Sequence, residues 1–443
     1  MSHWDSDLLN RKEDAQHIYD VALKIHDDGV VTGRTGVVMA IDAPWGEGKS
    51  YLIEGLCKDI KEKGHPVIHF NSWENDFSND PIVSFLSEMS EGLRNEFPCH
   101  KAIIDKVTDA SLKVAKKVGV TIMAGLVKKT VGLSVDELTS AWTDNPPKGG
   151  DSFSVDINKD IFNSHIEKKD ALEKFKARMS ELVQAIQKQE HQKRLPIFVV
   201  IDELDRCRPD FSIALLEGVK HLFSLDGVIF LIAANKAELS NSIKVLYGAN
   251  FDSTMYLKRF FDIDYQLITP SMSAIWRSEL NRYKINESTL FIPFRGSMDQ
   301  LIDGMSVYLK LSIRDIKQLA FKLYLIYDAV KENNGNIHIL YLLILLIIDF
   351  KDNRIDHDKS IEDQLGRIEV RCEEVYIDNV NFKNYSVHTA YAAYKTTENH
   401  HYPRNRKIHS QEDAIKMEIY ENTKNDVLAK YITALYGLGK ITS

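Results

Sequence analysis

The chain has 443 residues, enough for two or three domains of about 150 residues each. Hydrophobic residues make up 44% and charged residues 27%, a globular mixture that excludes collagen-like and disordered chains. The net charge of −8 argues against a protein that binds nucleic acid through bulk positive charge. The four cysteines are widely spaced without a Cys-x-x-Cys pair, which excludes a disulfide framework and a cysteine zinc site.

The N-terminal residues are polar and acidic, unlike a signal peptide. No apolar run reaches the roughly 18 residues that a membrane-spanning helix requires. The longest run, residues 337–350, has the length of a core helix. We therefore expect a cytoplasmic protein without a transmembrane segment.

The first part of the chain predicts a βαβ unit. Apolar residues at helical spacing predict a helix over residues 4–28, and the apolar run 37–41 predicts a buried parallel strand. A helix from Lys49 to about Glu62 and a second strand at 67–70 follow. Strand, turn, helix and strand in this order form one right-handed crossover unit.

An insert at about residues 98–165 separates two predicted amphipathic helices, 81–97 and 168–190. Within it, residues 107–135 have an apolar centre flanked by lysine pairs, and the polar stretch 143–160 predicts a loop. We favour a soluble helical hairpin for the apolar part. The lysine pairs leave weak contact with a membrane surface as the alternative.

Two further apolar runs, 195–201 and 228–234, predict buried strands with a helix at about 212–223 between them. Beyond about residue 270, helix is favoured in the segments 272–287, 298–331, 337–350, 360–371 and 411–437. The fold class is therefore α/β, with a parallel sheet flanked by helices and a mainly helical C-terminal domain.

The turn after the first strand has the chemistry of a phosphate-binding loop. It follows the pattern G-x-x-x-x-G-K-[ST], with alanine at the first position, and reads Ala43, Pro44, Trp45, Gly46, Glu47, Gly48, Lys49, Ser50. Gly46 and Gly48 permit the dihedrals that turn backbone N–H groups toward a phosphate, and the following helix aims its N-terminus at the anion. We expect Lys49 to contact the β and γ phosphates and the Ser50 hydroxyl to bind Mg²⁺, with Tyr51 ending the cofactor-binding segment.

Acidic residues follow the strand 195–201 directly. Because ligands bind at the carboxyl ends of parallel strands, we expect Asp202 to hold Mg²⁺ and Glu203 to polarise the attacking water. The phosphate loop is a Walker A motif and the strand ending in Asp202 is a Walker B motif. The adjacent acid indicates the branch of P-loop NTPases with an extra strand between the two strands that carry these motifs. Asn235, after the strand 228–234, then has the position of a catalytic sensor residue, with a helix cap as the equal alternative.

Six segments in order along the chain carry a family resemblance: Leu9–Ala15, Pro44–Ser50, Phe70–Trp73, Asp202–Cys207, Tyr256–Phe261 and Ser312–Lys317. Together, over roughly residues 5–325, they resemble the KAP family of P-loop NTPases. The resemblance implies a P-loop NTPase core at 1–270, including the insert, and a mainly helical C-terminal domain at 271–443. Glu203 replaces the usual aspartate, and Arg314 lacks the family's preceding Asn-Pro.

The resemblance implies an ATPase with ATP and Mg²⁺ as cofactors that acts as a conformational or assembly switch. It also implies bacterial anti-phage defence, with a homo-oligomer, a separate effector protein, or both as partners. A non-hydrolysing nucleotide-binding scaffold and a nucleic-acid-stimulated motor are the alternatives. GTP stays open as a substrate, because residues 235–238 approach the guanine-reading pattern N-K-x-D but end in glutamate.

Several further residues have two interpretations each. The candidates for an arginine finger or sensor are Arg206, Arg208, Arg259 and Arg314, with a plain salt bridge as the simpler role. Asn71 and Trp73 follow the second strand and are candidates to position water or base, with packing as the simpler role for Trp73. The basic and aromatic stretch 400–409 is a candidate contact for nucleic acid or phosphate, with a solvated loop as the simpler role.

Overall fold

A computed structural model describes residues 2–32, 36–115, 156–188, 194–222, 224–268, 271–330, 337–352, 369–377 and 380–397, with a few helical residues between 415 and 434. The apolar centre of the insert, most of the stretch 143–160 and the stretch 400–409 lie outside these residues. The chain divides into two compact units, Met1–Ile268 and Thr269–Ser443, and each is described by itself.

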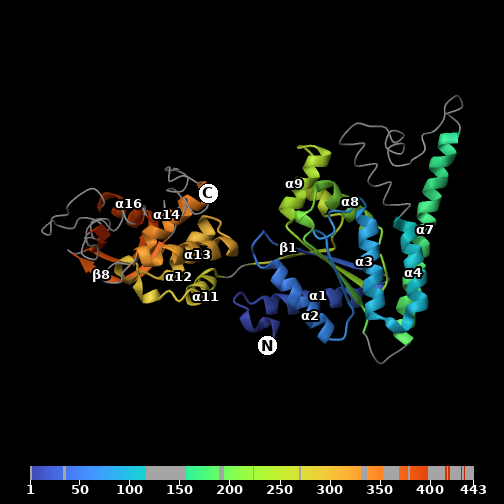
Figure 1. The fold of residues 1–443 in the computed structure, drawn as a ribbon, viewed down its shortest axis with the longest axis horizontal. Helices are drawn as coiled ribbons and strands as arrows, with labels where there is room; N and C mark the ends of the chain where they lie inside the picture. Colours follow the sequence, from blue (N-terminus) through green and yellow to red (C-terminus); the bar gives the residue numbers. More distant parts are fainter. Residues whose placement is uncertain are drawn as a thin grey trace. The chain divides into compact units, whose positions relative to one another are not determined.

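The first unit is built on a parallel five-stranded sheet (Figure 1). Its strands are β1 (Val37–Asp42), β2 (Val67–Asn71), β3 (Ile197–Asp202), β4 (Val228–Ala234) and β5 (Ile263–Gln266). They lie in the order β2-β3-β4-β1-β5. The extra strand between the two motif-bearing strands β1 and β3 is therefore confirmed, and it is β4.

The helices of this unit are α1 (Arg11–Thr32), α2 (Lys49–Glu62), α3 (Pro81–Glu96), α4 (Lys101–Val114), α7 (Asp156–Lys188), α8 (Pro209–Lys220), α9 (Lys236–Tyr247) and α10 (Ser253–Leu257). Short 3-10 turns occur at η1 (His3–Ser6), η2 (Pro98–His100) and η4 (Leu204–Arg206).

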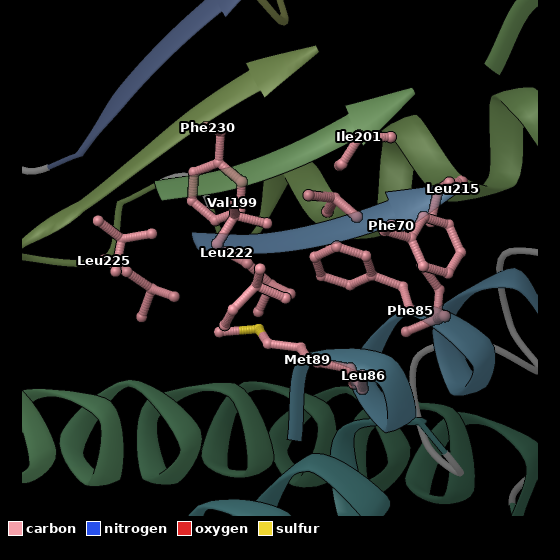
Figure 2. Packing of buried hydrophobic residues seen from close by; sticks show 14 of the residues in the cluster. Phe70, Phe85, Leu86, Met89, Val199, Ile201, Leu215, Leu222, Leu225 and Phe230 are labelled. Carbon is pink, nitrogen blue, oxygen red and sulfur yellow. The ribbon is translucent and has the colours of Figure 1, made fainter. Parts of the chain in front are cut away.

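The central strands are apolar on both faces because helices cover both sides of the sheet. On one face Phe198 and Val200 of β3 pack with α1 and α2. On the other face Val199 and Ile201 pack with α3, α4, α7 and α8. Figure 2 shows this second core, where Phe70 of β2 meets α3. The alternation along β3 explains why its sequence has no polar face.

The strand register brings the functional edge of the sheet together. Asp42 at the end of β1 pairs with Ala234 at the end of β4, and Asn71 at the end of β2 pairs with Asp202 at the end of β3. Because all five strands are parallel, their carboxyl ends and the loops that follow them share one edge.

Two boundaries in the first unit differ from the sequence prediction. The helix predicted over 4–28 is instead the turn η1 followed by α1, because Asn10 has a left-handed φ of 56°. The Asp7 carboxylate accepts hydrogen bonds from the backbone of the segment that follows. The helix α7 begins at Asp156, so the end of the stretch predicted as a loop is helical.

The described part of the second unit is mainly helical, as predicted, and also has strands. Its elements are α11 (Ser273–Arg282), η5 (Glu287–Thr289), β6 (Leu290–Phe291), η6 (Pro293–Arg295), α12 (Met298–Tyr308), α13 (Ile313–Val330), β7 (Ile337–His338), α14 (Ile339–Asp352), β8 (Glu369–Ile377), β9 (Val380–Ser386) and α16 (Val387–Thr397). Strands β8 and β9 form an antiparallel pair. No helix in the described part of the chain combines the length and apolarity needed to cross a bilayer.

Two helix predictions in this unit are wrong in detail. The helix predicted over 298–331 is broken into α12 and α13, because Lys310 has a φ of 52° and Ser312 and Asp315 form a reciprocal cap. Residues 369–371, predicted as a helix end, belong to β8.

Candidate nucleotide-binding site

The loop between β1 and α2 has the backbone shape that its glycines predict. Gly46 and Gly48 have φ angles of 86° and 80°, in the left-handed region that disfavours a Cβ. Gly48 is the N-cap of α2, and no side chain caps the helix, so its first N–H groups remain available to an anion. Ala43 needs no glycine because its φ lies outside the left-handed region.

Lys49 is buried in this loop, with 8% of the residue exposed. Its Nζ donates to the carbonyl of Ala43 at 2.9 Å and lies 3.6 Å from Oδ2 of Asp205. Burial lowers the pKa of Lys49, and the carboxylates of Asp205, Asp202 and Asp42 oppose this shift. The ammonium group is therefore held among carboxylates at the carboxyl edge of the sheet.

The Walker B carboxylates lie at the end of β3. Asp202 is buried, which raises its pKa to about 6, although its Oδ1 accepts the Glu203 amide at 2.7 Å. Glu203 has a left-handed φ of 59°, a strained conformation for a residue with a side chain. Its Oε1 pairs with Nη1 of Arg206 at 2.8 Å.

The residues present fit a magnesium ion with nucleotide phosphates. Hydroxyl and carboxylate oxygens are the ligands that Mg²⁺ prefers, and Ser50 and Asp202 supply both. Asp205 adds a second buried carboxylate, whose Oδ1 has no hydrogen-bond partner. The carboxylates of Asp202, Glu203 and Asp205 outnumber the cations Lys49 and Arg206 beside them, so the site favours a bound cation.

Asn235 begins the helix after β4. Its Oδ1 accepts from the amides of Ala237 and Glu238 at 3.1 and 3.4 Å, so the helix-cap interpretation is correct. This cap fixes the side chain beside the end of β1, because the Lys236 amide donates to Asp42 at 2.9 Å. The sensor interpretation stays a prediction. The cap is compatible with it, because the cap uses Oδ1 of Asn235 and not Nδ2.

The other loop residues divide by where their side chains lie. The indole Nε1 of Trp45 donates to Oδ2 of Asp205. The carbonyl of Glu47 accepts from Arg11 at 3.0 Å, and Pro44 is exposed. Tyr51 turns its ring away to the N-terminal segment, where its hydroxyl donates to the carbonyl of His3 at 2.9 Å. A cofactor role of Tyr51 would therefore use its backbone.

The loop after β2 lies beside the Walker B segment. Asn71 shapes it, since its Oδ1 accepts from the amides of Trp73 and Glu74. Trp73 is 55% exposed, so it does not pack into the core, and the Arg206 guanidinium lies over its ring at 5.6 Å. A role of Trp73 in positioning water or base stays a prediction. Arg208 joins this loop to the segment after β3 through a salt bridge to Asp76 at 3.1 Å.

Arg206 and Arg208 thus form the salt bridges expected as their simpler role, and a finger or sensor role stays a prediction for both. Arg259 is exposed just before β5, and Arg314 is exposed in the first turn of α13 in the second unit. A finger or sensor role for either stays a prediction.

Two buried charged residues contact the loop without having been predicted as site residues, Arg11 and Asp205. Both lie in segments that carry the family resemblance, Leu9–Ala15 and Asp202–Cys207. Their contacts with the loop span 36 and 160 residues of sequence, a separation over which local patterns give no signal.

Fold and site together define a P-loop protein of the type with β4 inserted between the two Walker strands. A model of the KAP family P-loop domain matches residues 13–330. The chain belongs to this family, which confirms the resemblance seen in its sequence.

Comparison with curated proteins finds no match. Among solved structures, the chain is similar to the Aeropyrum pernix ORC2 protein in ADPNP–ADP complexes. The two are 13% identical, the comparison covers 97% of this chain and 98% of that chain, and the TM-score is 0.32.

Proposed function

We propose that the protein is a Mg²⁺-dependent ATPase that acts as a conformational or assembly switch. The observation that carries this proposal is the contact between the two motifs: Lys49 of the phosphate loop lies 3.6 Å from Asp205, three residues after the Walker B aspartate. Cation, helix N-terminus and carboxylates thus meet in one site, which phosphoryl transfer requires.

Each side chain has a separate role in this proposal. The loop amides and Lys49 bind and orient the phosphates, while Ser50 and Asp202 hold the metal. Bound Mg²⁺ supplies neutralisation of phosphate charge. Glu203 accepts the proton of the attacking water, and the Nδ2 group of Asn235 orients that water.

Phosphate release from ATP tests the enzyme proposal. We expect wild-type protein with Mg²⁺ to release phosphate, and Glu203→Gln to do so about 10²–10⁴-fold more slowly with unchanged ATP binding. ATP binding without release by the wild type would instead favour the non-hydrolysing scaffold. Release that requires added DNA or RNA at low salt would favour the nucleic-acid-stimulated motor. Parallel measurements with GTP decide the base preference.

We further propose that the protein works in the cytoplasm in bacterial anti-phage defence, through a homo-oligomer, a separate effector protein, or both. Family membership supports this proposal. Phage plating on bacteria that carry the gene with its chromosomal neighbours tests it. We expect fewer plaques with the wild type than with Lys49→Ala, and equal plaque numbers would refute the defence role.

A further inference from the structure

The phosphate loop is attached to its surroundings at alternate residues. Ala43 accepts from the ammonium of Lys49, which closes the loop on itself. Trp45 and Glu47 are instead held by residues outside the motif, Asp205 and Arg11. Gly46 and Gly48, next to these anchors, have the left-handed φ angles that a residue with a Cβ rarely adopts. The loop shape therefore depends on two external contacts of opposite charge.

Arg11 holds the loop from the side of the N-terminal helix. This arginine is fully buried at the start of α1. Its Nη2 donates to the carbonyl of Glu47 at 3.0 Å, and its Nη1 donates to the carbonyl of Ile268 and to Asp14, both at 2.8 Å. Because the guanidinium is planar and rigid, one side chain fixes all three acceptors in one geometry.

Asp205 holds the loop from the Walker B side. Its side chain is 1% exposed, and one oxygen, Oδ2, both accepts from the Trp45 indole and lies 3.6 Å from Lys49. The residue sits in the turn η4, which follows β3 directly, so its position is fixed by the sheet. Asp205 thereby connects two functional residues of the loop to the strand that carries Asp202.

We propose that Arg11 and Asp205 are positioning residues that hold the phosphate loop in its nucleotide-binding shape. A loop already ordered in its binding shape loses less conformational entropy when the ligand binds, so the affinity is higher. Neither residue needs to touch the nucleotide to have this effect. The inference rests on the proposed nucleotide binding and names the residues on which its affinity depends.

A double-mutant cycle tests the Asp205 anchor. Trp45→Phe and Asp205→Ala each remove the indole–carboxylate bond, and we expect each to raise the Kd for Mg-ATP about tenfold. The double variant is expected to bind no more weakly than Asp205→Ala, because Trp45→Phe removes only a bond that Asp205→Ala has already broken. Asp205→Asn keeps an acceptor oxygen for Trp45 and should therefore lose less affinity than Asp205→Ala.

A matched control comes from the same chain. Trp4 donates its indole N–H to Asp59 at 3.0 Å. This bond is of the same type but lies at the C-terminal end of α2, away from the phosphate loop. Trp4→Phe should leave the Kd for Mg-ATP unchanged even if the melting temperature falls. Trp45 is 46% exposed, so Trp45→Phe keeps the test decisive if Asp205→Ala does not fold.

Arg11→Lys tests the second anchor. It keeps the positive charge beside Asp14 but replaces the planar donor fork with one ammonium that cannot reproduce its geometry. We expect a folded protein whose Kd for Mg-ATP rises about fivefold, while kcat at saturating ATP changes less than twofold. A lower kcat at unchanged affinity would contradict a positioning role in binding.

Two kinds of failure are distinguishable. Wild-type protein that binds no nucleotide would refute the proposed function. Wild-type protein that binds Mg-ATP, with Trp45→Phe and Arg11→Lys binding equally well, would overturn the positioning inference alone. Additive losses in the double variant would also overturn the Asp205 link.

Discussion

Replacing Lys49 by methionine should destabilise the protein even where nucleotide is absent. Methionine has nearly the length of the lysine stem, so packing is largely kept while the charge is lost. Lys49 and Asp205 are both buried, with side-chain exposures of 9% and 1%. Asp205 and Asp202 then lose the nearby positive charge that favours their ionised forms in the wild type.

The structure gives the size of this effect. Two unit charges 3.6 Å apart attract by about 5 kcal/mol at an effective dielectric constant of about 20. Breaking a buried pair on one side costs about 3–5 kcal/mol, because the remaining charge stays desolvated. The burial of Lys49 itself opposes folding, as its lowered pKa indicates, and this offsets part of the loss. We therefore expect Lys49→Met to lower the free energy of unfolding by about 3 kcal/mol.

Urea unfolding without nucleotide or Mg²⁺ measures this quantity. The double variant Lys49→Met/Asp205→Asn serves as the control, because it removes the uncompensated carboxylate and keeps an acceptor for Trp45. It should regain at least half of the lost stability without regaining ATP binding. If the free energy of unfolding of Lys49→Met lies within about 0.5 kcal/mol of the wild-type value, the Lys49–Asp205 pair does not stabilise the fold and the reasoning is refuted.

Three further changes probe the site and its supports. Gly48→Ala should weaken Mg-ATP binding and lower the free energy of unfolding by about 1–2 kcal/mol, since its φ is 80°. The control Gly248→Ala, with a φ of 99° and open space around it, should lower stability without loss of Mg-ATP affinity in titration calorimetry. Asn235→Ala removes the helix cap and should lower the free energy of unfolding, measured with urea, by about 1 kcal/mol. Asn235→Asp should keep the cap, so equal stability of the two variants would contradict the capping geometry. Burial lowers the pKa of His65, so the unfolded chain takes up a proton before the folded one and stability falls as the pH drops below about 6.5. Urea midpoints from pH 7.5 to 5 should therefore decline less steeply for His65→Gln, and parallel curves would exclude His65 as the cause.

Sequence patterns predicted those parts of the fold whose causes are local. The strands β1, β3 and β4 are short apolar runs buried on both faces, and the loop before α2 needs left-handed backbone that only glycine adopts easily. The order of motif, strand and helix along the chain then led to the correct sheet type.

The errors and omissions have physical causes beyond the local pattern. The break between α12 and α13 depends on Lys310, a residue type with no preference for a left-handed φ. The β8–β9 pair has β-branched and aromatic residues interrupted by charged ones, so its strand pattern is weak. Arg11 and Asp205 gain their roles from contacts across the folded chain, and Trp73 is exposed despite its large ring.

The place of β2 at the border of the sheet has a consequence for how such a protein can diversify. The crossover from β2 to β3 begins at this border strand, while the phosphate loop is supported by the neighbouring ladder of β3, β4 and β1. New segments can thus be added to that crossover during evolution without rebuilding the strands that carry the phosphate loop and Asp202. An inserted module that binds a partner would disturb the sheet least at this position.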